Sequence, residues 1–164
     1  MCEYCGCQAL PAIADLTAEH DQVVALISRV RTSTSVAEMA ELARAIAGVL
    51  APHTVVEEQG LFPALTGEFA DHITALTTEH RQIERVLAEA AHGVPDDPAW
   101  PDRLRAALQV LREHILTEQD GVFPAALGFL ANEEWAAIDA VRARVGTAVP
   151  ASARDRCERS AAPR

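Results

Sequence analysis

HTVVEEQGLFPA, at residues 53–64, recurs as HILTEQDGVFPA at residues 114–125. A second stretch also recurs, because LTAEHDQV at residues 16–23 returns as LTTEHRQI at residues 76–83. Each copy of the repeat therefore presents one histidine and then a second histidine, which a glutamate follows four residues later. A duplicated unit of this kind predicts a site for two metal ions at a pseudo-twofold axis.

Length and composition limit the class of protein. The chain has 164 residues, enough for one domain with a sizeable core. Hydrophobic residues make up 49% and charged residues 23% of it, which is typical of a globular protein rather than a disordered one. Aromatic residues account for only 4%, and alanine and leucine are abundant, so packed helices are favoured over a sheet.

Charge and the absence of targeting signals narrow the function further. The net charge of -10 argues against nucleic acid and against an anionic membrane surface, since both need a basic face. No apolar run approaches the length of a membrane span, and the N-terminus lacks the layout of a secretory signal. We therefore expect a cytoplasmic protein whose cysteines are thiols or metal ligands rather than structural disulfides.

Apolar residues at spacings of three and four predict helices along most of the chain. The expected helices are residues 11–31, residues 35–60, a helix capped by Asp71, residues 102–120, and residues 133–145 behind a cap at Asn132. Gly60 and Pro63 should end the second helix, and Pro52 should kink it. Four long helices with short links predict an all-α fold, an up-down-up-down four-helix bundle with a short extra C-terminal helix.

The same pattern divides the chain into three segments. Residues 1–10 form a Cys-rich N-terminal arm, and residues 11–146 form the bundle. Residues 147–164 contain mainly Ala, Arg, Ser and Pro without periodicity, which predicts a flexible tail.

Four histidines lie on the apolar stripes of the four long helices, one on each: His20, His53, His80 and His114. An interior imidazole must have both ring nitrogens satisfied, and helical carbonyls nearby are already bonded. For any one of these histidines alone, a satisfied core residue is the simpler interpretation. Their occurrence at matched positions of two repeats favours metal ligands.

Two glutamates follow two of these histidines at helical spacing. Glu57 and Glu118 lie four residues after His53 and His114. Four residues of α-helix advance about 6 Å and rotate only about 40°, so each pair projects from one face. Carboxylates buried among imidazoles are costly unless cations neutralise them. His72 and His92 lie off the stripes, and we expect them on the solvated surface.

These repeats resemble the hemerythrin-like family, the His-His-Glu cation-binding domain, over about residues 10–130. The resemblance implies a left-handed four-helix bundle that holds a non-haem di-iron centre, two iron ions with an oxo or hydroxo bridge. By matching position, it implies that His20 and His53 ligate one iron, that His80 and His114 ligate the other, and that Glu57 and Glu118 bridge them.

The chain departs from the family's oxygen carriers at two positions. Glu84 stands where the carriers have a second third-helix histidine, and Glu118 replaces an aspartate at a spacing of five. A more anionic ligand set favours ferric iron and weakens the case for reversible oxygen carriage. Glu84 is either an additional ligand or a solvated residue paired with Arg81 or Arg85.

Four acidic residues adjoin the expected ligands in sequence. Glu19 and Glu79 recur beside His20 and His80, and each is either solvated or orients a neighbouring helix. Asp21 and Glu58 follow ligands directly, and adjacent helical residues point about 100° apart. We therefore expect these two to support the ligands from outside or to lie on the surface.

The N-terminal arm carries Cys2, Cys5 and Cys7. Three thiols are one short of the usual zinc or iron–sulfur set, so metal binding, redox-active thiols and an incidental arm all stay open. Tyr4 is a possible ferric ligand, because extended chain of about 3.3 Å per residue could carry its phenol back to the site. The alternative is a surface or packing tyrosine.

The expected function is redox turnover of a small oxidant, hydrogen peroxide or nitric oxide, at a carboxylate-bridged metal pair. Such a protein would be a catalase- or peroxidase-like oxidoreductase whose partner is a small diatomic or peroxide ligand. The alternative is an iron- or oxygen-sensing module, or an iron-repair or storage module, without turnover.

Overall fold

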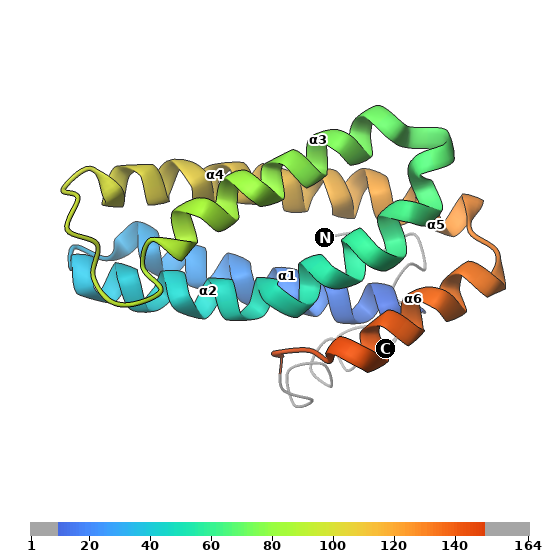
Figure 1. Ribbon diagram of the computed structural model, residues 1–164, viewed down its shortest axis with the longest axis horizontal. Helices are drawn as coiled ribbons and strands as arrows, with labels where there is room; N and C mark the ends of the chain where they lie inside the picture. The colour runs from blue at the N-terminus through green and yellow to red at the C-terminus, as the bar shows by residue number, and fades with distance from the viewer. Residues whose placement is uncertain (1–9, 150–164) are drawn as a thin grey trace, which may run out of the picture.

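The computed structural model describes residues 10–149, and these are helical with no strand among them (Figure 1). The all-α prediction is therefore confirmed for this part of the chain. Cys2, Tyr4, Cys5 and Cys7 lie outside the described residues. The elements are α1 (Pro11–Thr32), α2 (Val36–Val56), η2 (Glu57–Leu61), α3 (Phe62–Ala88), α4 (Trp100–Thr117), η3 (Glu118–Val122), α5 (Phe123–Phe129) and α6 (Asn132–Val145).

The four long helices pack as two pairs, α1 with α2 and α3 with α4, while α5 and α6 lie at one end (Figure 1). Two apolar clusters fill the interior. One, which includes Ile27, Ile46 and Trp100, lies toward the α3–α4 connection. The other, which includes Leu16 and Phe123, lies toward α5 and α6. The four histidines lie near the boundary between these clusters, so the polar site forms a layer across an otherwise apolar core.

The second helix does not end where the sequence suggested. The chain stays helical through Gly60 and Pro63, and the break comes at Phe69, whose φ of -130° and ψ of 34° are not helical. The reason lies in η2, a π-helical turn in which the Phe62 N–H donates to the Glu57 carbonyl. A π turn loosens the regular ladder, so Pro63, which has no N–H, is accommodated directly after it.

The fourth helix shows the same behaviour. We expected it to span residues 102–120, but α4 passes into the π turn η3 and then into α5. Asn132 is the first residue of α6 rather than its cap. The preceding Ala131 N–H donates to the Glu134 carboxylate at 2.7 Å, which satisfies one free donor at the helix start.

We expected a flexible tail from residue 147 onward, but residues 147 and 149 contact the bundle. Val149 is buried against the core, and the Thr147 hydroxyl donates to Glu19 at 2.5 Å. Side-chain contacts with the bundle therefore continue past the end of α6, at least to residue 149.

The continuous helical stretch Val36–Ala88 contains an 18-residue window that is long and apolar enough to cross a membrane. Of that window, 56% is buried inside the bundle. A core helix of a soluble bundle passes the same test, so the stretch is weak evidence for a membrane span.

Helix α6 docks on Gly60. A Cβ atom at Gly60 would lie 3.3 Å from the Ile138 Cα, whereas one at Gly121, the matching position of the other repeat, would meet nothing within 4 Å. Only one copy of the repeat is therefore covered by α6.

We predict that Gly60→Leu destabilises the protein while Gly121→Leu does not. The larger side chain must displace the α6 backbone, at a cost of about 1–3 kcal/mol. For a domain of this size that is about 2–4 °C of melting temperature per kcal/mol. Gly121→Leu should be neutral or slightly stabilising, because leucine favours helix over glycine. Equal melting temperatures for the two variants would contradict this account of α6.

Candidate metal centre

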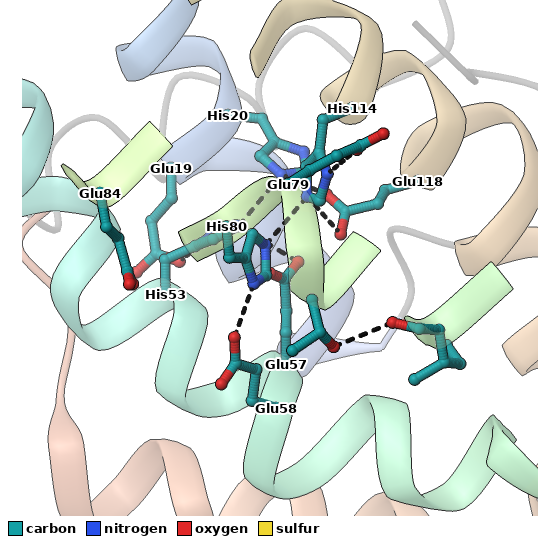
Figure 2. A network of polar contacts seen from close by, with 12 residues as sticks. Glu19, His20, His53, Glu57, Glu58, Glu79, His80, Glu84, His114 and Glu118 are labelled. Atoms are coloured by element: carbon teal, nitrogen blue, oxygen red, sulfur yellow. Dashed lines mark hydrogen bonds and ion pairs between the residues drawn. The ribbon is translucent and has the colours of Figure 1, made fainter. Parts of the chain in front are cut away.

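The six residues singled out by the repeats come together in the interior (Figure 2). Their ligand atoms form two groups of four, and within each group all atoms lie within 4.8 Å of one another. Both groups share Glu57 and Glu118. The first group adds His20 and His53, and the second adds His80 and His114.

Each shared glutamate contacts one histidine of its own repeat and one from another helix. Glu57 lies 3.1 Å from Nε2 of His53 and 3.4 Å from Nε2 of His80. Glu118 lies 3.0 Å from Nε2 of His114 and 3.2 Å from Nε2 of His20. Glu57 and Glu118 are the first residues of the two π turns, and π turns are frequent at functional sites.

Three of the four imidazoles are held from behind by a carboxylate. Nδ1 of His53 lies 2.8 Å from Glu19, Nδ1 of His80 lies 2.9 Å from Glu58, and Nδ1 of His114 lies 2.8 Å from Glu79. An ionised carboxylate can only accept, so each Nδ1 carries a proton and donates it outward. This is the arrangement that orients metal-ligating histidines, with Nε2 turned toward the ion.

The Nε2 atoms face one another in pairs. His20 and His53 approach to 3.1 Å between their Nε2 atoms, and His80 and His114 approach to 3.0 Å. Two unprotonated imidazole nitrogens at this distance would oppose lone pair to lone pair. Nδ1 of both His80 and His114 is protonated, so this pair needs a positive charge at its inner face, either a proton or a metal ion. In the other pair only His53 is held in this way, because Nδ1 of His20 has no hydrogen-bond partner among the described residues.

The carboxylates show the same need for positive charge. All four oxygens of Glu57 and Glu118 are buried and have no hydrogen-bond partner among the described residues. They lie close to imidazole nitrogens, but without the angles of hydrogen bonds. A buried carboxylate is costly unless it is paired or binds a cation. The donor set of two shared carboxylates and four imidazoles fits a pair of transition-metal ions such as iron, manganese or zinc.

The opposite charges of the buried carboxylates and imidazoles also shift the pKa values of the metal-free site. Burial alone would lower the pKa of His53, but the charge of Glu57 and the bond to Glu19 raise it to about 10. Burial likewise opposes the charged form of His114, but the charge of Glu118 raises its pKa to about 9. Burial would raise the pKa of Glu57, yet the charges of His53 and His80 hold it well below its ordinary value.

The recurring Phe-Pro pairs cover the site from the α5–α6 end. Phe62 stacks on His80 with ring centroids 5.7 Å apart, and Phe123 stacks on His20 at 5.6 Å. Both phenylalanines are buried. The phenylalanine of each repeat thus packs against a histidine of the other repeat. Together the two rings exclude water from that end of the site.

Glu84 lies at the opposite side and is 43% exposed. Its carboxylate pairs with Arg81 at 2.7 Å, and it belongs to neither group of candidate ligand atoms. Glu84 also lines a cavity of about 10 Å³ together with all four histidines and Thr54, room for about one water-sized molecule. The other interpretation of Glu84, a residue paired with Arg81, is thus the one that the geometry supports.

Several surrounding residues could be identified only from the structure. Glu19 is completely buried and accepts from both Nη atoms of Arg142, at 2.7 and 2.8 Å, as well as from Thr147. Arg142 carried no sequence signal, because it lies outside both repeats. The recurrence of Glu19 and Glu79 was the available signal for the outer carboxylates. Asp21, His72 and His92 are exposed.

We predict that the metal-free protein loses stability as the pH rises from about 6.5 toward 10. The folded pKa values of His53 and His114 lie above the ordinary value of 6.5. The folded state therefore keeps protons that the unfolded state releases, and their stabilisation is lost through this window. The slope is about 1 kcal/mol per pH unit for each histidine, measured by denaturant unfolding after chelation.

His53→Gln should flatten this slope, and His72→Gln, which removes an exposed histidine, is the matched control. A metal-free protein whose stability rises between pH 7 and pH 9 would contradict the charge balance described here.

Comparison with known proteins agrees with this geometry. The family model described as the hemerythrin HHE cation binding domain matches residues 12–126. A curated DNA nickase from Nostoc sp. (strain PCC 7120) is 25% identical over 117 residues, 71% of this chain and 33% of the relative, so this chain spans about a third of that protein's length. No solved structure matches the chain significantly. Because the family match covers most of the chain and all six clustered residues, the protein belongs to the hemerythrin HHE cation-binding domain family.

Proposed function

We propose that this protein holds two iron ions and uses them to turn over a small oxidant, hydrogen peroxide or nitric oxide. In this proposal His20 and His53 ligate one ion, His80 and His114 ligate the other, and Glu57 and Glu118 bridge them. The four long helices alternate in direction, up-down-up-down, so that both histidine pairs lie at the same level along the bundle. The observation that carries the proposal is the set of buried carboxylate oxygens that have no hydrogen-bond partner within residues 10–149 and are faced by paired imidazole nitrogens.

The bound iron pair would supply electron transfer to or from a small molecule, and the protein would control access and charge. Glu19, Glu58 and Glu79 hold protons at the three outer Nδ1 atoms and so keep Nε2 free for the ions. Phe62 and Phe123 exclude water from one end. The cavity that the four histidines line together with Thr54 and Glu84 is the space through which a small molecule would reach the proposed ions.

The charge around the site favours turnover over oxygen carriage. Two shared carboxylates, and the outer carboxylate Glu79, which has no arginine contact among the described residues, place negative charge around the proposed ions. Such charge stabilises the higher oxidation state. Glu84 replaces a neutral histidine of the oxygen carriers and pairs with Arg81 instead. A centre that rests oxidised is suited to meet an oxidant or a radical, and we propose that it does so in the cytoplasm.

Two other functions must be separated from this one. A sensing, iron-repair or storage module would bind the same ions without turnover. The similarity to a DNA nickase makes DNA nicking a further candidate, but this chain matches only a third of that protein, and its net charge of -10 opposes DNA binding.

We predict two iron ions per chain in iron-replete protein, and at most one in Glu57→Gln or Glu118→Gln. Removing either carboxylate takes a shared donor from both ions. Glu84→Gln should retain two ions, because Glu84 lies outside both groups of ligand atoms. Metal removal should also lower the melting temperature, since ions that bind the folded state stabilise it. Metal analysis that finds two ions in Glu57→Gln would remove Glu57 from the site.

We further predict that the purified iron protein consumes hydrogen peroxide or nitric oxide, and that Glu57→Gln loses this activity by at least about tenfold. Reduced protein exposed to oxygen should be oxidised rather than form an adduct that releases oxygen when the pressure falls. Two bound ions with no consumption of either oxidant would favour the sensing or storage alternative. Reversible oxygen release over many cycles would restore the carrier, and nicking of plasmid DNA would favour the nickase relative's activity.

A further inference from the structure

The two halves of the site are related by the repeat, but their surroundings are not. The matching carboxylates Glu19 and Glu79 each accept from the Nδ1 of a histidine at 2.8 Å. Glu19 is completely buried, whereas the side chain of Glu79 is 37% exposed. The difference comes from α6, which covers only the Glu19 side and lies beyond the residues that match the family.

On the covered side, Arg142 of α6 holds Glu19 with both guanidinium nitrogens, at 2.7 and 2.8 Å. Arg142 is itself buried and also donates to the Gly146 carbonyl at 2.9 Å. Thr147 adds a further bond to Glu19. A two-pronged contact of this kind fixes the carboxylate in orientation as well as in charge.

On the open side, the corresponding contacts face solvent. Glu58, which accepts from His80, has a side chain that is 19% exposed, and its cation partner Arg81 is 52% exposed. Glu79 accepts from His114, and the structure gives it no arginine contact among the described residues. Water can solvate these carboxylates and compete for their bonds, so they restrain their histidines less firmly.

We propose that Arg142 is a positioning residue that makes the two ion positions unequal. Arg142 fixes Glu19, and Glu19 fixes His53. The restraint of the ion held by His20 and His53 therefore depends on Arg142, because Nδ1 of His20 has no hydrogen-bond partner among the described residues. The ion held by His80 and His114 is restrained instead by Glu58 and Glu79 and does not depend on Arg142. This inference rests on the proposed two-ion site and adds a residue of α6 that controls one ion position and not the other.

The physical basis is the buried charge of Glu19. Without Arg142, a completely buried carboxylate would keep, among the described residues, the imidazole and one hydroxyl as partners. That is a costly state, which the chain can relieve by moving Glu19 away. His53 would then lose the acceptor that aims its Nε2 inward. Loss of such an outer partner typically weakens metal binding by about 10–100-fold.

The test is stepwise Zn²⁺ loading of the metal-free full chain, followed by nuclear magnetic resonance of the imidazole groups. Signals of His53 and His114 report the two positions separately, so ions bound at the N-terminal cysteines are not counted. In the wild type, the signals of both histidines should shift as two equivalents are added. Chelator competition then gives the affinity of each step.

Arg142→Gln should weaken the His53 step by about tenfold or more, while the His114 step changes little. Arg142→Lys should restore part of the loss, and Thr147→Val should affect the same step more weakly. The matched control is Arg81→Gln, which removes the exposed arginine of the other half and should change either step by less than about fivefold. If Arg142→Gln does not fold, Arg142→Lys and Thr147→Val carry the test.

The outcomes separate the two proposals. Fewer than two ions at the histidines of the wild type would overturn the proposed function, and this inference with it. An Arg142→Gln variant that weakens both steps alike, or neither step, would overturn the inference alone.

Discussion

Two carboxylates lie at the centre of an apolar bundle with no hydrogen-bond partner in the part of the chain that the structure describes, and the rest of the structure depends on this constraint. Glu57 and Glu118 are completely buried, and bare carboxylates there would each cost several kcal/mol. The molecule answers with positive charge at close range, from protons on the imidazoles in the metal-free state and from cations in the state that we propose. The raised pKa values of His53 and His114 express this demand in a measurable form.

The charges around the carboxylates are arranged in alternating layers. Imidazoles surround Glu57 and Glu118, carboxylates hold three of the imidazoles from behind, and arginines balance two of those outer carboxylates. Each layer satisfies the one inside it, so a change at the periphery reaches the centre through short contacts. The outermost contact, between an arginine and an outer carboxylate, is buried at Arg142 but exposed at Arg81. This difference breaks the symmetry of an otherwise duplicated site.

The π turns connect the repeat to this geometry. Both begin at a shared glutamate, and both are followed by phenylalanine and proline. The turn widens the helix where the carboxylate projects inward, tolerates the missing proline N–H, and directs the phenylalanine onto a histidine of another helix. One local irregularity, used twice, therefore places the carboxylate and covers the site at the same time.

The sequence by itself determined the helical fold and the six clustered residues, because duplication and the four-residue spacing of His53 with Glu57 are local properties of a helix. It did not determine where the second helix ends, because Gly60 and Pro63 signal a stop that the π turn overrides. It could not reveal Arg142 or Thr147, whose contacts with Glu19 join residues far apart in the chain. Nor could it decide between a ligand and an ion pair for Glu84, since the choice depends on how far α3 holds that carboxylate from the imidazoles. Only tertiary packing fixes such distances, because helical periodicity sets the face on which a residue lies but not what lies opposite that face.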